Sequence, residues 1–186
     1  MDGRYKCRFL GKRGLLMALL ATAGLLGLAP KADLAFAAPA KPKLVVLDIE
    51  LTGDLGGPQF TAEHAARLRT ESAILRRALE ASGLYQVLDN TPALPLINQL
   101  KSQQAYWHDC NGCDLQVGRQ LGADQVLVTW VNRVSNLILS LTYEFHDVAS
   151  GQIVGRKSYD FRGDNDAAWT HTITFMVRDL KESQDK

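Results

Sequence analysis

The sequence has few cysteines and lacks the motifs of the common catalytic and metal-binding sites. It contains three cysteines in 186 residues, too few for a fold built on disulfides. No Gly-x-Ser-x-Gly elbow, phosphate-binding loop, His-Glu-x-x-His motif or EF-hand loop is present. The sequence therefore nominates no catalytic residue and no cofactor, and it favours a protein that is not an enzyme.

The amino-terminal residues 1–37 have the pattern of a cleavable secretory signal. Basic residues open the chain, and Leu15 to Leu28 is then almost entirely apolar. A membrane span needs about 20 apolar residues, so this shorter run disfavours the alternative of an uncleaved anchor. Ala35-Phe36-Ala37 supplies the small-x-small site of a signal peptidase. We expect cleavage after Ala37 and a periplasmic or secreted protein.

Removal of residues 1–37 leaves a chain of the length of one ordinary domain. We expect a flexible leader at 38–43, a single α/β domain at 44–180 and a polar tail at 181–186. The remaining chain is slightly acidic and has no basic stripe, which disfavours nucleic-acid binding. It has no further apolar run of membrane-spanning length, so no membrane span is expected after cleavage.

The hydrophobic periodicity of the domain predicts an α+β fold, an α/β sandwich. We expect a mixed sheet of about five strands with an antiparallel carboxy-terminal meander and helices packed mainly on one face. The expected strands are 44–51, 85–88, 125–134, 137–148 and 153–161. The expected helices begin at Thr61, at Thr91-Pro92, at Cys113 and at Asp164 or Asn165. In the last helix Trp169 begins the stripe that we expect to be buried.

Several charged residues are interpreted as solvated. The arginines of the first helix, among them Arg67 and Arg76, lie mostly off its apolar stripe and are expected to face water. Asp48 and Glu50 share one face of the first strand and receive the same interpretation. The histidines outside the Cys-x-x-Cys segment are expected at the surface; they are His64, His146 and His171.

The segment His108-Asp109-Cys110-Asn111-Gly112-Cys113-Asp114 carries the most specific chemistry of the chain. Cys7 leaves with the signal, so Cys110 and Cys113 would be the remaining cysteines, in a compartment that favours disulfides. A structural disulfide is the first interpretation. Redox activity is the second, because a helix amino terminus stabilises a thiolate. Metal binding by His108, Cys110 and Cys113, completed by Asp109 or Asp114, is the third and weakest.

The second half of the chain resembles a family of small exported bacterial proteins with no assigned function. The resemblance rests on the Cys-x-x-Cys segment, on Leu121-Gly-Ala-Asp124 before a strand, and on Asp147-Val-Ala-Ser-Gly151. The order of elements also looks like that of the amino-terminal domain of TolB and of the curli-secretion lipoprotein. The resemblance implies an α/β domain of the cell envelope that contacts other proteins or assembles.

These observations favour a periplasmic, non-enzymatic accessory or protein-binding module of the cell envelope, with other envelope proteins as partners. The alternatives are a thiol–disulfide redox protein that uses Cys110 and Cys113, and a metal-binding chaperone. The sequence identifies neither the binding residues nor the oligomeric state.

The signal peptide gives the first testable prediction. When the full chain is expressed in a bacterium, the exported protein should begin at Ala38, because signal peptidase cleaves after a small-x-small segment. Mass spectrometry of the periplasmic and secreted fractions checks this expectation. A mature species that still contains Met1 to Leu28 would contradict it.

Overall fold

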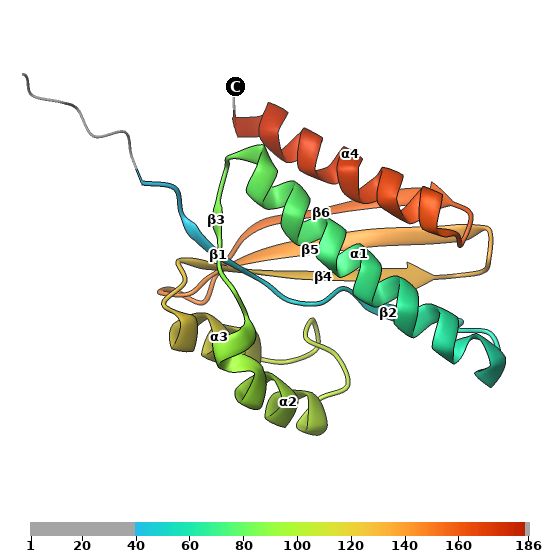
Figure 1. Ribbon diagram of the computed structural model, residues 1–186, viewed down its shortest axis with the longest axis horizontal. Coiled ribbons are helices and arrows are strands. Elements are labelled where there is room, and N and C mark those ends of the chain that lie inside the picture. The colour runs from blue at the N-terminus through green and yellow to red at the C-terminus, as the bar shows by residue number, and fades with distance from the viewer. Residues whose placement is uncertain (1–39, 185–186) are drawn as a thin grey trace, which may run out of the picture. The chain divides into compact units, whose positions relative to one another are not determined.

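The computed structural model describes residues 40–184, so the predicted signal peptide lies outside the described residues. Four α-helices, two short 3-10 helices (η1 and η2) and six strands follow one another within this part of the chain (Figure 1). The elements are β1 (Lys43–Val46), β2 (Glu50–Gly53), η1 (Pro58–Phe60), α1 (Thr61–Ser82), β3 (Gln86–Val87), η2 (Thr91–Ala93), α2 (Leu94–Gln103), α3 (Cys113–Leu121), β4 (Gln125–Arg133), β5 (Ile138–Asp147), β6 (Ile153–Arg162) and α4 (Asp166–Gln184).

The strands form one open, mixed sheet in the order β3-β1-β4-β5-β6, with β2 also paired to β4. β1 is parallel to β3 and β4, and β2 is parallel to β4. β4, β5 and β6 are antiparallel neighbours. The predicted α+β class, mixed sheet and antiparallel meander are confirmed.

The segment 44–51, predicted as one strand, forms two. β1 and β2 are separated by Leu47, Asp48 and Ile49, which raises the number of strands to six. The pairing with β4 shifts by one residue across this break, from Val46 opposite Leu127 to Glu50 opposite Trp130. The break thus acts as a β-bulge, which turns the following side chains to the other face of the sheet. The Ser72 hydroxyl of α1 accepts a hydrogen bond of 2.9 Å from the Ile49 N–H, which the sheet leaves free.

Two hydrophobic cores fill the two faces of the sheet. The long helices α1 and α4 cover one face, and the short helices α2 and α3 cover part of the other (Figure 1). The α1/α4 core contains residues such as Leu44, Val46, Leu75, Leu127, Leu141, Trp169 and Ile173. The α2/α3 core contains Val45, Leu47, Ile97, Trp107, Cys113, Val117, Val126 and Val128. The alternation along β1, with odd and even residues in different cores, follows from the two-residue period of a strand.

A buried group of charges joins α1 to the far end of β4 and to the start of α4. The Asp164 carboxylate accepts hydrogen bonds from Arg67 (2.9 Å), Arg133 (2.7 Å) and the Trp169 indole (3.2 Å). The Arg67 side chain is only 6% exposed. The prediction that the arginines of α1 are solvated is therefore wrong for Arg67, whose partner comes from a segment almost a hundred residues away.

The end of α1 and the buried stripe of α4 agree with the sequence. α1 ends at Ser82, and Gly83 follows it with the positive φ of 77° that glycine tolerates. In α4, Trp169 is buried, as predicted, together with Ile173 and Met176. Thr61 is the first residue of α1 but makes no capping bond, because η1 precedes it.

The buried tryptophan of α4 gives a second prediction. Trp169 is 1% exposed, so Trp169→Ala should lower the free energy of unfolding by about 3–5 kcal/mol through the cavity that it creates. Urea denaturation followed by circular dichroism measures this loss. The control His171→Ala changes an exposed residue of the same helix and should cost less than about 0.5 kcal/mol. A loss below about 1 kcal/mol for Trp169→Ala would contradict the packing described here.

Candidate functional site

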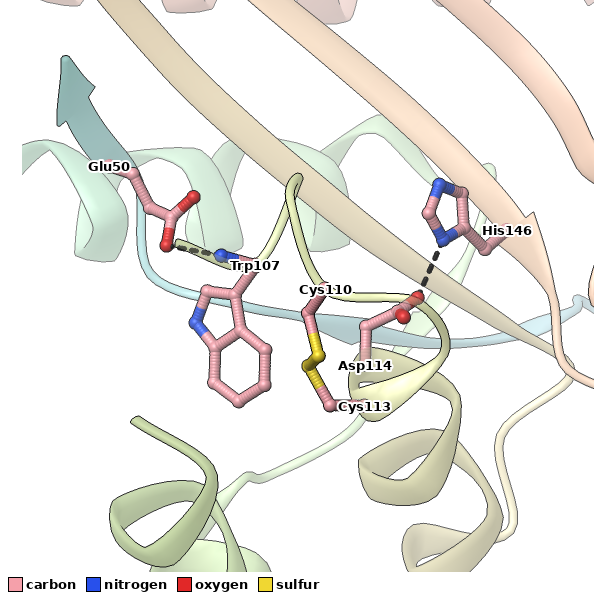
Figure 2. The surroundings of a disulfide bond; sticks show 6 residues. All are labelled: Glu50, Trp107, Cys110, Cys113, Asp114 and His146. Atoms are coloured by element: carbon pink, nitrogen blue, oxygen red, sulfur yellow. Dashed lines mark hydrogen bonds and ion pairs between the residues drawn. A yellow bond between two sulfur atoms is a disulfide. The ribbon is translucent and has the colours of Figure 1, made fainter. Parts of the chain in front are cut away.

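Cys110 and Cys113 form a disulfide at the amino terminus of α3 (Figure 2). Their Cα atoms are 5.8 Å apart, and Cys113 is the first residue of the helix. Gly112, directly before the helix, has a φ of 85°, a conformation that lets the chain turn between the two cysteines. Cys113 is 3% exposed and belongs to the α2/α3 core, whereas Cys110 is half-buried at its margin.

The α3 helix approaches the sheet closely through a glycine. A Cβ atom added to Gly118 would lie 2.6 Å from Val126 of β4 and 2.7 Å from Val148. The absence of a side chain at Gly118 thus allows α3, and with it the disulfide, to pack against β4.

The Glu50 side chain of β2 holds the loop that precedes the disulfide through polar contacts. One carboxylate oxygen accepts a hydrogen bond of 2.7 Å from the Trp107 backbone N–H, and the other lies 2.9 Å from the His108 Nδ1 (Figure 2 shows the first contact). Burial raises the pKa of the Glu50 carboxyl above its usual value, although the bonds from His108 and Trp107 oppose this rise. The prediction that Glu50 is solvated is wrong, because the bulge after β1 turns it toward this loop.

His108 contacts the sheet through its ring as well as through Glu50. Its imidazole stacks on Trp130 of β4, with ring centroids 4.6 Å apart and planes tilted by 12°. The three predicted metal-ligand candidates lie in one segment, but two of them share a disulfide and the third faces Glu50. Within residues 40–184, no three His, Cys, Asp or Glu side chains are grouped in a way that would hold a metal ion.

A second histidine, on β5, contacts the residue that follows the disulfide. Asp114, next to Cys113, places Oδ2 2.6 Å from the Nδ1 of His146 on β5 (Figure 2). The other ring nitrogen, Nε2, lies 3.0 Å from Glu144. Two ionised carboxylates can only accept hydrogen bonds, so this arrangement favours the doubly protonated form of His146. The hydrogen bond to Asp114 raises the pKa of His146 above 6.5, against the opposing effect of burial.

This triad was not predicted from the sequence. The interpretation of His146 as a surface residue is wrong, because α3 covers the polar face of β5 at that point. The alternation along β5 did place Glu144 and His146 on one face, which was the available signal. The position of Asp114 next to them depends on how α3 packs on the sheet, and hydrophobic periodicity contains no information on that packing. His64 is also buried (8% exposed), with Nε2 3.0 Å from the Leu55 carbonyl, whereas His171 is exposed as predicted.

A cavity of about 280 Å³ lies beside the disulfide loop, next to the carboxyl ends of β1 and β3. Trp107 forms part of its wall, and Arg76 and Lys101 contribute cationic groups that both contact Asp48. The buried indole N–H of Trp107 has no hydrogen-bond partner among the residues that the structure describes. Asp48 is therefore paired rather than simply solvated, and the two cations hold the pKa of its carboxyl below the usual value although burial acts in the opposite direction.

The described residues thus define an open α+β domain in which a disulfide-closed loop is attached to one face of the sheet, through Glu50 of β2 and His146 of β5. The chain belongs to the family DUF3280, described as a protein of unknown function (DUF2380), whose model matches residues 42–180. The predicted membership of a family with no assigned function is confirmed. No curated protein matches the chain. Among residues 40–184, no helix has the length and apolar character needed to cross a membrane.

Solved structures with a similar arrangement come from bacteria. The LpoB carboxy-terminal domain from Salmonella enterica is 18% identical, with 68% of this chain and 86% of that chain covered and a TM-score of 0.42. PelC from Paraburkholderia phytofirmans, solved as a dodecamer, is 15% identical over 74% of this chain and 82% of that chain, with a TM-score of 0.45. TolB from Acinetobacter baumannii is 12% identical over 73% of this chain and 27% of that chain, with a TM-score of 0.43. Identities this low transfer no function.

The Asp114–His146–Glu144 triad predicts a specific pH dependence. The folded-state pKa of His146 is raised above 6.5, so its contribution to stability is full below about pH 6.5 and is lost as pH rises through the folded-state pKa. Thermal unfolding of the wild type should therefore fall in midpoint as pH rises through this range. His146→Gln, which keeps a hydrogen-bonding side chain but does not titrate, should flatten the profile. Parallel profiles for the two proteins would contradict the role of His146.

Proposed function

We propose that this chain is a non-enzymatic, protein-binding accessory module of the bacterial cell envelope. It acts in the periplasm after removal of residues 1–37, and its partners are other envelope proteins. In this proposal Cys110 and Cys113 form a structural disulfide that shapes a binding loop.

The way in which the disulfide loop is fixed carries the proposal. A redox-active pair needs an accessible sulfur and freedom to form a mixed disulfide with a partner. Here Cys113 is 3% exposed, and the flanking residues are tied to two strands through Glu50 and His146. The loop is therefore held as part of the scaffold, which supports a structural role for the bond.

The same fixation supports binding by the loop. Between the two attachments, Asp109 and Asn111 remain exposed, and Gln104 and Ala105 are exposed before Trp107. Loops held by a rigid scaffold are frequent binding elements because little conformational entropy is lost on contact. A disulfide also fits a compartment outside the cytoplasm, where such bonds persist.

One observation favours the redox alternative. Cys110 is half-buried rather than buried, and the disulfide lies at the amino terminus of α3, where a thiolate would be stabilised. The metal-binding alternative requires that the disulfide first be reduced, since thiolates are the metal ligands. We therefore place it last.

Replacement of both cysteines tests the proposal. Cys110→Ser/Cys113→Ser should still fold and should lose about 1–3 kcal/mol, because the bond closes a very short loop. When expressed at a permissive temperature in a strain that lacks the protein, this variant should also restore the wild-type phenotype. Asn111→Ser is the matched control, since it changes the same loop and keeps both cysteines.

The reduction potential separates the alternatives independently. A structural bond should have a potential below about −300 mV, measured by equilibration with thiol buffers. A value near −120 to −200 mV, together with partner proteins trapped as mixed disulfides by single cysteine variants, would overturn the proposal in favour of redox activity. Zinc or copper bound to protein purified from the periplasm would favour the metal-binding alternative.

A further inference from the structure

β6 is a long edge strand. In the part of the chain that the structure describes, it pairs with β5 and has no partner on its other side. Its ten residues are mostly exposed. An edge of this length presents a row of unpaired N–H and C=O groups that can accept another strand.

Apolar side chains accompany this edge. Ile153 and Val154 at the start of β6 are 51% and 55% exposed. Phe175 of α4 is 39% exposed and packs edge-to-face on Tyr159 of β6, with ring centroids 5.6 Å apart. Covering these solvent-exposed apolar groups with a further strand would remove them from water and would stabilise the pairing of that strand with the edge.

The charges of β6 restrict which strand fits. A second copy related by a two-fold axis through the sheet pairs antiparallel with β6, and opposite residues then have their side chains on the same face. Four such arrangements pair most of the strand, and they are centred on Arg156, Lys157, Ser158 or Tyr159. The first two place identical cations opposite each other, and the fourth places Arg156 opposite Arg162.

Only the arrangement about Ser158 brings opposite charges together. It places Arg156 opposite Asp160 of the second copy, twice by symmetry, and Lys157 opposite Tyr159, with no like charges facing each other. Opposite charges across a strand pair stabilise it and like charges destabilise it. Arg156 already lies 3.0 Å from Glu144 of β5, so its guanidinium would bridge carboxylates of both copies.

We propose that β6 is a self-association edge: two copies pair antiparallel about Ser158, so that their sheets join into one. The charges of β6 then select this register, because each of the other three alignments places like charges opposite each other. Charges on an edge strand can alternatively serve only to keep it unpaired, and that interpretation predicts a monomer.

A cysteine at the two-fold axis tests the register. In this arrangement Ser158 faces Ser158 of the second copy at the Cα separation of about 4.5–5.5 Å typical of opposite residues, which a disulfide spans. Ser158→Cys in the chain from Ala38 onward should therefore form a covalent dimer under mild oxidation. Lys157→Cys is the matched control and should form no covalent dimer, because diagonal residues lie too far apart for a disulfide. Cross-linking of Lys157→Cys but not of Ser158→Cys would overturn the proposal.

A charge reversal tests the same edge without a new cysteine. Asp160→Lys places cations opposite Arg156 of the second copy and should weaken dimerisation by about tenfold or more in analytical ultracentrifugation, since two attractive pairs become repulsive. Arg162→Glu, opposite an apolar residue, should leave dimerisation nearly unchanged. Circular dichroism and thermal unfolding verify that each variant is folded. A wild-type chain that remains monomeric at every concentration tested, or equal effects of the two substitutions, would overturn the proposal.

Discussion

The structure depends on one extra residue between β1 and β2. Both strands pair with β4, and the residue inserted between them reverses the direction of every following side chain. Ile49 and Leu51 thereby enter the α1/α4 core, and Glu50 points to the opposite face. In an uninterrupted strand the Glu50 carboxylate would point into the α1/α4 core, at the large cost of burying a charge among apolar groups. The bulge thus places the Glu50 carboxylate on the face of the sheet where it binds the disulfide loop.

Buried charges elsewhere in the domain follow the same rule that each must have partners. The Asp164 carboxylate accepts hydrogen bonds from two arginines and an indole, and Asp114 and Glu144 both contact the ring of His146. Desolvation makes an unpaired buried charge costly, so removal of any one partner leaves a larger penalty than the pair itself contributes. These groups join elements that are far apart in the sequence, and they fix how α1, α3 and α4 lie on the sheet.

Sequence patterns predicted the elements better than their connections. The start of α3 at Cys113 and the burial of Trp169 in α4 were predicted, because helix starts and apolar stripes leave local signals in the sequence. The division of the first strand was missed because Leu47 and Ile49 are both apolar, and a bulge leaves no compositional trace in such a run. Glu50 and His146 were misinterpreted for a related reason. Alternation assigns a residue to a face, but it does not reveal which helix covers that face.

The attachments also determine what the disulfide contributes. A bond between residues three apart in the sequence removes little entropy from the unfolded chain, so it adds little to global stability. The order of the surrounding loop comes instead from the Glu50 carboxylate, the stacking of His108 on Trp130 and the burial of Trp107. None of these contacts involves a sulfur atom. Reduction would therefore release only the short turn between the cysteines, while the rest of the loop would stay in place. A protein that used this pair as a switch would need a larger element to depend on it, whereas a binding loop needs only to be held still.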